Sequence, residues 1–328
     1  MKRVLRGFLA GLVAVGAAQA GADCGSIPYS APLRSAIDVV RENISDDAMG
    51  NKSSEQATVV FDPLKVSVFE PKQRALILWN GEEEILLLST DQKATRASAV
   101  LEVIPLPAEP QVRLGSFAMF EKAQKLMVEK RMWVCAHGGA KAGAVPVPPE
   151  AGRITFHAKL GVHDLTVAQV LDAGHFVEFV QKHLREHYQT PDAPIDPRFV
   201  KVIESYLDAG FRWFTFDSIN LDEKLRSRDP VEYRFKSDKV FYPLRISTLE
   251  EGRTELDLLV FTANGVSRFE GVTAAELNRE EPLPVTPAEV GGIEPTWQGF
   301  FGPDEELVLD QWSLEGESSK LVRDVLVK

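Results

Sequence analysis

Two uninterrupted apolar segments in the first half of the chain predict a buried β-hairpin. Residues 75–78 read Ala-Leu-Ile-Leu and residues 85–88 read Ile-Leu-Leu-Leu. Between them, Asn80-Gly81 favours the positive φ angles of a two-residue turn. Because polar residues do not alternate with apolar ones in either segment, we expect both faces of the hairpin to be covered, and the cover to be helical.

The remaining periodicity predicts further strands and a few amphipathic helices. The expected strands are residues 65–70, 97–104, 154–160, 162–170, 211–219, 231–236, 241–247 and 254–262, and the expected helices are residues 33–44, 117–132, 175–188 and 197–208. Strands and helices come in runs rather than in strict alternation. The fold class is therefore α+β, with a largely antiparallel sheet or sheets covered by a few amphipathic helices.

Turn and loop signals divide the chain. Residues 136–152 contain four glycines and three prolines, which predicts a flexible loop between two halves. The expected segments are a signal peptide (1–20), an N-terminal α+β half (21–145), a C-terminal α+β half (146–270) that is either separate from the first or one domain with it, and a Pro/Gly-rich acidic tail (271–328). The tail is expected to end in a hairpin formed by residues 307–314 and 320–327.

The N-terminus has the three parts of a secretory signal peptide. Lys2, Arg3 and Arg6 precede an apolar run over residues 8–18, and Ala18-Gln19-Ala20 supplies small residues at a cleavage site. An uncleaved membrane anchor is the alternative, but the run is shorter than the roughly 20 apolar residues that span a bilayer. A lipid anchor would need apolar and small residues just before the first cysteine, and Gly21-Ala22-Asp23 does not provide them. We expect an extracytoplasmic protein, periplasmic or secreted, with no transmembrane segment after cleavage.

The charge balance changes with cleavage and narrows the choice of partner. The chain has 37 Lys and Arg against 48 Asp and Glu, a net charge of -11. Loss of three basic residues with the signal peptide leaves 34 against 48, which is -14. Such an acidic surface argues against binding to nucleic acid and to anionic lipid.

The two cysteines predict a disulfide bond. Cys24 and Cys135 are far apart in the sequence and both lie in the exported part. In an oxidising compartment they are most simply one bridge, with two free thiols as the alternative. A metal site formed by Cys24, Cys135 and His137 has weak support, because its surroundings are rich in glycine.

One segment carries the pattern of a catalytic metal site. His183-Leu184-Arg185-Glu186-His187 matches the H-x-x-E-H pattern of inverted zinc peptidases, in which two histidines bind Zn²⁺ and the glutamate acts as general base. The alternative is an ordinary amphipathic helix end, because the two histidines fall within or beside its apolar arc. Histidines near a helix C-terminus are also stabilised by the helix dipole.

A catalytic zinc needs a third protein ligand, which the sequence does not single out. Glu204 and Glu255 are candidates only as acids in an acid-rich chain. Other catalytic patterns are missing: there is no G-x-S-x-G, no P-loop, no G-x-G-x-x-G after a strand, no EF-hand loop and no C-x-x-C.

Several separate blocks of sequence resemble a bacterial family known as domain of unknown function 2330. The blocks are residues 73–81 with Glu84 and Leu87, then residues 101–107, 184–188, 206–211 and 242–247. The resemblance extends over roughly residues 61–270. It implies an exported protein with no established activity or catalytic residues, in which residues 184–188 form an ordinary amphipathic helix end.

These features together favour a non-catalytic binding or envelope-associated protein. Its partner would be an envelope or extracellular ligand or protein, and no cofactor is expected. The alternative is a zinc-dependent hydrolase in which His183 and His187 hold the metal and Glu186 is the general base.

Overall fold

The computed structural model describes residues 25–29, 63–137, 164–190, 194–250, 252–270 and 277–327, with the side chains of Pro63, Asp164 and residues 133–137 excepted. Strands make up 43% of the described residues, the sheets are mostly antiparallel, and these residues form four helices, which confirms the predicted α+β class. No helix in these ranges is long and apolar enough to cross a membrane. The predicted signal peptide, the first predicted helix and the strand predicted at residues 154–160 lie outside the described residues.

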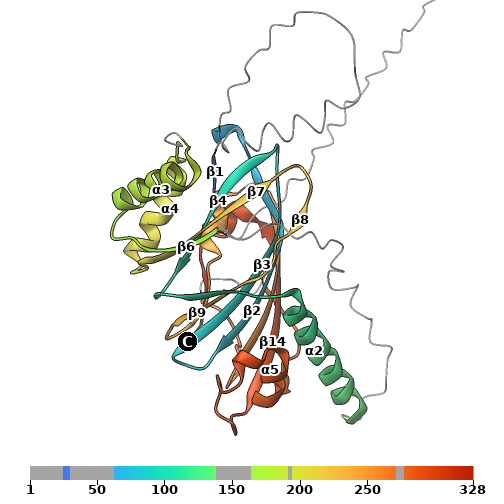
Figure 1. Cartoon of the computed structure of the whole chain (residues 1–328). Coiled ribbons are helices and arrows are strands. Elements are labelled where there is room, and N and C mark those ends of the chain that lie inside the picture. The colour runs from blue at the N-terminus through green and yellow to red at the C-terminus, as the bar shows by residue number, and fades with distance from the viewer. Residues whose placement is uncertain are drawn as a thin grey trace, which may run out of the picture.

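The elements follow one another in a strand-rich order (Figure 1). The strands are β1 (Gly25–Tyr29), β2 (Val68–Trp79), β3 (Glu83–Ala94), β4 (Ser98–Leu106), β5 (Gln111–Leu114), β6 (Asp164–Gln169), β7 (Trp213–Leu221), β8 (Arg226–Ser227), β9 (Val231–Lys236), β10 (Val240–Tyr242), β11 (Arg253–Thr262), β12 (Leu277–Arg279), β13 (Leu283–Val285), β14 (Leu307–Glu317) and β15 (Val325–Val327). The helices are α2 (Phe117–His137), α3 (Ala173–Tyr188), α4 (Pro197–Asp208) and α5 (Pro287–Ile293), with short 3-10 turns η1 (Pro63–Lys65), η2 (Arg245–Leu249), η3 (Pro295–Trp297) and η4 (Ser318–Lys320).

Two sheets form the body of the molecule. The larger has the order β12-β14-β11-β2-β3-β9-β5, with β13 paired to β14 and β8 to β3, and the smaller has the order β1-β4-β7-β6. Every pairing is antiparallel except that of β2 with β11. Strands from both predicted halves lie next to each other, since β3 pairs with β9 and β4 pairs with β7.

The layers follow from the alternation of side chains along the strands. On β2, Leu76 and Leu78 face α2 and α5, whereas Ala75 and Ile77 belong to the cluster that also holds Ile104 of the smaller sheet. The outer face of the smaller sheet packs against α3 and α4. Figure 1 accordingly shows α3 and α4 on one side of the sheets, and α2 and α5 on the other. The predicted cover of the hairpin is helical on one face and a second sheet on the other.

The predicted hairpin forms, but its turn is longer than the sequence indicates. Trp79 pairs with Glu84 and β3 begins at Glu83, so residues 80–82 make the connection. Gly81 has a φ of 97°, while Asn80 does not adopt a positive φ. The Asn80 side-chain oxygen instead accepts hydrogen bonds from the backbone N–H groups of Glu82 and Glu83, at 3.0 and 2.9 Å. The asparagine therefore shapes the turn through its side chain.

The C-terminal segment differs most from the prediction. Residues 307–317 do not form a hairpin with residues 320–327, because β14 pairs with β11, β12 and β13, and β15 pairs with β10. The predicted strand at residues 241–247 is likewise wrong beyond Tyr242, where the chain turns into η2. Local alternation identified strands here, but pairing between distant strands decided the partners.

Candidate functional site

An open groove of about 1070 Å³ lies between α2 and the C-terminal segment. Residues of α2, of the turn after β11, of β13 and α5, and of the segment that leads into β14 form its walls. The lining residues are Leu126, Glu129, Lys130, Ala263, Asn264, Pro284, Val285, Thr286, Pro287, Glu289, Pro303, Asp304, Glu305, Glu306, Leu307 and Val308. The groove has an apolar floor, including the buried Val285 and Leu307, and an acidic rim.

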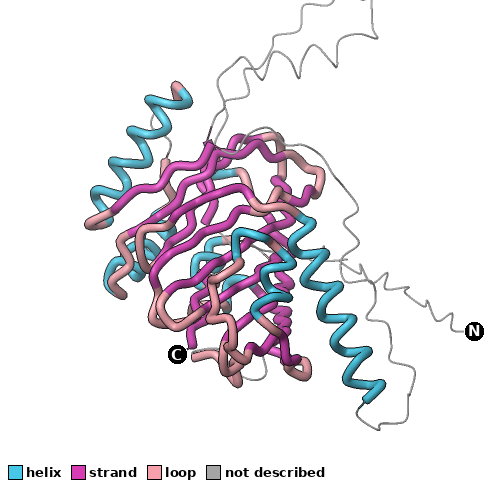
Figure 2. The backbone as a smooth tube through the Cα atoms, turned by 60° about the horizontal axis from the view of Figure 1, so that its bottom comes forward, coloured by secondary structure: helices cyan, strands magenta, loops and turns pink. Residues whose placement is uncertain are grey.

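The first wall is the part of α2 that includes Leu126, Glu129 and Lys130. Residues of its N-terminal half, including Phe120 and Met127, are buried against the larger sheet. Further along the helix, Val128 and Met132 are 48% and 66% exposed. The end of α2 projects past the strands, as Figure 2 shows from below, while Arg131 still donates a hydrogen bond of 2.7 Å to Gln311 of β14.

The second wall is a short helix with a well-defined start. Thr286 caps α5 in a capping box with Glu289, and Pro287 occupies the first turn, where its missing N–H costs nothing. Lys130 of α2 reaches Glu289 with an N···O distance of 2.8 Å. Burial raises the pKa of Glu289, but hydrogen bonds from Lys130 and Thr286 outweigh it, so this pKa lies below its ordinary value.

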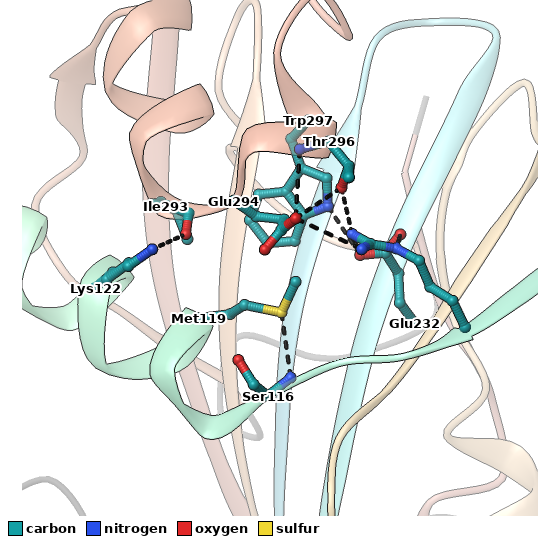
Figure 3. A network of polar contacts seen from close by, with 9 residues as sticks. Ser116, Met119, Lys122, Glu232, Ile293, Glu294, Thr296 and Trp297 are labelled. Carbon is teal, nitrogen blue, oxygen red and sulfur yellow. Dashed lines mark hydrogen bonds and ion pairs between the residues drawn. The ribbon is translucent and has the colours of Figure 1, made fainter.

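A polar network holds the end of α5 in place (Figure 3). Arg113 of β5 donates two hydrogen bonds of 2.6 Å to Glu232 of β9 and one of 2.5 Å to Thr296. The Trp297 indole N–H donates to the same Glu232 at 2.9 Å, and Lys122 of α2 donates to the Ile293 carbonyl at 2.8 Å. The groove is thus built between two elements that are fixed to the same sheet.

The H-x-x-E-H segment lies at the other side of the molecule, on α3. His183 is only 5% exposed, and its ring stacks on Phe179 with a centroid distance of 5.7 Å. The His183 and His187 rings are 4.6 Å apart, but His187 and Glu186 are exposed, and Glu186 lies 4.0 Å from Lys182. The two histidines are therefore close together, with one in the core and one at the surface.

The described residues bring no third metal ligand to this pair. No group of three or more His, Cys, Asp or Glu side chains in those ranges has the arrangement of a metal site. Glu204 is exposed on α4, and Glu255 on β11 contacts Lys72 at 3.3 Å. Cys24 and the side chain of Cys135 lie outside the described part, so the disulfide stays a prediction, as does the zinc site.

A buried ionic cluster fills part of the space between the two sheets. Gln92 donates hydrogen bonds to Glu70 and Glu102, and Arg228 forms ion pairs with Glu102 and Asp217. All five side chains are less than 10% exposed. The cavity beside Glu102 and Arg228 has a volume of about 20 Å³, too small for anything much larger than a water molecule. This cluster joins the sheets and leaves no room for a substrate.

A second small cavity lies beside Glu250, between β1 and α4. It has a volume of about 100 Å³ and includes Ser26 and Arg198 in its lining. Burial, with a smaller contribution from the charge of Glu70, raises the pKa of Glu250 well above its ordinary value. Its volume is a tenth of that of the groove, and ligand pockets in proteins usually span about 300–1,000 Å³.

Fold and site together define an α+β protein with two main sheets, an open, acidic-rimmed groove and, among its described residues, no cluster of side chains that could hold a metal ion. The chain belongs to the family described as "Uncharacterized protein conserved in bacteria (DUF2330)", whose family model matches residues 57–282. This confirms the resemblance seen in the sequence. The match ends before α5 and β14, so the C-terminal wall of the groove lies beyond it.

Comparison with other proteins adds little on function. No curated protein matches the sequence. Among solved structures, that of baculovirus P35 is similar over 80% of this chain and 97% of that chain, with a TM-score of 0.42 and 10% sequence identity. A similarity of this size establishes neither a common fold nor a common activity.

Sequence analysis did not identify the groove. Its residues come from four separate stretches between Leu126 and Val308, and no periodicity relates them. The available signal was the combination Thr286-Pro287 with Glu289, which is a helix start. Because this helix start lies in a segment rich in proline and acidic residues, the sequence predicted a tail here. In the structure the same segment forms α5, which is one wall of the groove.

Proposed function

We propose that this protein is an extracytoplasmic, non-catalytic binding protein, and that the groove between α2 and α5 holds a segment of a partner polypeptide. The observation that supports this most directly is the size and openness of the groove, about 1070 Å³ with many exposed residues along its walls. Small-molecule pockets are typically enclosed and no larger than about 1,000 Å³. An extended or helical peptide suits an open groove of this volume better than a small ligand does.

The rigidity of the walls also supports binding rather than catalysis. Both helices are packed on the larger sheet, and the Arg113–Glu232 network fixes the residues that follow α5. A groove that exists before the partner arrives costs little ordering on binding. Among the described residues, no group of three or more His, Cys, Asp or Glu side chains has the arrangement of a metal site.

The test is binding of short designed peptides to the mature protein, followed by fluorescence anisotropy. Three peptides would share one leucine pattern and carry lysine, serine or glutamate at their polar positions. Asn264→Trp places a large side chain at an exposed position that lines the groove, and Leu225→Trp makes a matched change at an exposed position outside the lining.

We expect at least one peptide to bind saturably to the wild type and to Leu225→Trp, and about tenfold more weakly to Asn264→Trp, since one lost or blocked contact of about 1.4 kcal/mol is a factor of ten. If none of the three binds, or if the two tryptophan variants bind equally well, the proposed function is wrong.

A further inference from the structure

The geometry points to a particular partner for the groove: a polypeptide segment that carries both apolar and lysine or arginine side chains. This inference rests on the proposed function and specifies the chemistry of the occupant. It follows from three properties of the lining: its apolar floor, the sign of its rim and the way in which the rim carboxylates are already engaged.

The floor of the groove calls for apolar side chains. Val285 and Leu307 are buried at its base, and the partly buried Leu126, Ala263 and Val308 continue the same surface. The walls add three prolines, Pro284, Pro287 and Pro303. A purely hydrophilic partner would leave this surface without contacts, so part of the occupant should be apolar.

The rim has one dominant sign of charge. Among the described lining residues there are five acids and one base, Lys130. The acids are Glu129, Glu289, Asp304, Glu305 and Glu306, and they stand on both walls of the groove. Lys130 is already paired with Glu289 at 2.8 Å, so it does not neutralise the others.

The remaining rim carboxylates differ in how far they are engaged. Glu305 accepts a hydrogen bond of 2.9 Å from the Gly302 N–H and thereby shapes the loop, and Glu129 lies 3.8 Å from Lys125 in an exposed contact. Asp304 and Glu306 are exposed and form no ion pair with any described residue. These two are available for a partner.

When a partly apolar segment binds, the sign of its charged side chains affects the affinity. When a segment covers the floor, it removes water from the nearby rim carboxylates, which is costly unless a cation replaces the lost hydration. A neutral or acidic segment would leave that cost uncompensated. A segment with alternating apolar and basic side chains satisfies the floor and the rim together, and the opposite charges also accelerate encounter.

The experiment compares two variants that lose the same charge. Asp304→Asn with Glu306→Gln neutralises two rim carboxylates and leaves Glu305 to hold the loop. Asp208→Asn with Glu109→Gln neutralises one exposed Asp and one exposed Glu outside the lining, so the net charge of the two double variants is identical. The probes are the lysine, serine and glutamate peptides, measured at low and at high salt.

We expect the wild type to bind the lysine peptide about tenfold more tightly than the glutamate peptide. The rim variant should weaken lysine-peptide binding by about three- to tenfold and reduce its salt dependence, as two exposed ion pairs of up to about 1 kcal/mol each imply. The control variant should change it by less than about twofold. The last comparison separates the groove from the general attraction of an acidic protein for a cationic peptide.

Two results would overturn this inference and leave the proposed function intact. One is peptide binding that Asn264→Trp weakens but that does not distinguish lysine from serine or glutamate. The other is an equal loss in the two double variants, which would assign the effect to net charge alone. If no peptide binds in a way that depends on Asn264, both the inference and the proposed function fail.

Discussion

The helices on the two sides of this molecule differ in how much of their length packs against a sheet. On one side, α3 and α4 bury a continuous face: Phe176, Val180 and Leu184 of α3 and Ile203 and Tyr206 of α4 are all fully buried against the smaller sheet. On the other side, Met127 is the last buried residue of α2 among the side chains that the structure describes, and the end of the helix extends past the larger sheet. The packed pair leaves little space, whereas the helix that extends beyond its sheet makes the wall of a groove.

This difference explains why the most suggestive motif in the sequence is not where the best binding surface lies. The H-x-x-E-H segment belongs to the packed side, where His183 contributes to an aromatic cluster with Phe179 and Phe216. The groove lies on the side with incomplete packing. A binding surface needs apolar area that the protein's own core does not use.

The comparison predicts very unequal responses to truncation. Phe176→Ala should destabilise the protein by about 3–5 kcal/mol, because the ring is fully buried between Phe199, Phe214 and Phe216 and leaves a cavity. Val128→Ala on α2 should change stability by less than about 0.5 kcal/mol, because this residue is 48% exposed. Urea denaturation measures both, and similar losses would show that α2 is packed like α3.

Removing one hydrogen bond on each side should also give unequal losses of stability, with a smaller difference than the truncations give. The Tyr206 hydroxyl donates to the Asp324 carboxylate at 2.6 Å and accepts from the Ile246 N–H at 3.1 Å. Tyr206→Phe leaves both groups buried without this partner, so we expect a loss of about 1–3 kcal/mol.

The matching change on the groove side is Lys122→Met, which removes an exposed donor to the Ile293 carbonyl and should cost about 0.5 kcal/mol in the same assay. A larger effect for Lys122→Met than for Tyr206→Phe would contradict the comparison.

The wall of the groove depends on the cap of α5. Thr286→Ala removes the side-chain oxygen that accepts from the Glu289 N–H at 3.3 Å and should cost about 1 kcal/mol. Thr286→Ser keeps that oxygen and should retain nearly all of the stability. Thermal unfolding of the three proteins tests the cap, and an equal loss in the serine variant would mean that the threonine methyl group, rather than the cap, is responsible.

The contributions of two carboxylates to stability, one on each side of the molecule, should change in opposite directions with pH. Burial raises the pKa of Asp324, and the charge of Arg245 and the hydrogen bond from Tyr206 only partly oppose this. The contribution of Asp324 to stability therefore decreases as the pH rises above the pKa of this carboxyl in the unfolded chain. The pKa of Glu289 is lowered, so its contribution is present above about pH 4.5 and is lost as pH falls through the folded value.

Glu289→Gln should therefore cost a few tenths of a kcal/mol at neutral pH, which is the size of an exposed ion pair, and nothing in strong acid. Glu281→Gln, an exposed acid outside the groove, is the control for urea titrations over this pH range. If the stability difference between the wild type and Glu289→Gln grew as the pH fell, the pKa of Glu289 would be shifted in the opposite direction to the one assigned here.

The smallest effect is expected at the exposed histidine of the motif. His187→Ala should change stability by less than about 0.5 kcal/mol, since the side chain is exposed and contacts His183 and Tyr188 only at ring distances of 4.6 and 6.3 Å. We also expect tag-free protein to contain no zinc that depends on His187. Stoichiometric zinc in the wild type that disappears in this variant would establish the hydrolase alternative.

Local patterns predicted much of the fold because local physics decides it. Residues 197–208 form α4 as expected, since Asp196 caps the helix and Pro197 starts it. Residues 231–236 form β9, and the uninterrupted apolar segments form a hairpin that is covered on both faces. Caps, turn residues and side-chain periodicity act within a few positions, so the sequence displays them directly.

Tertiary structure decided the rest, because it depends on contacts between distant residues. Nothing local indicates that β14 pairs with β11, that η2 replaces the end of a predicted strand or that α2 extends past its sheet. The sequence by itself determined the α+β class and the position of most helices and strands. Which strands became neighbours, which histidine was buried and where a groove stayed open were decided by which apolar faces could be covered at the same time.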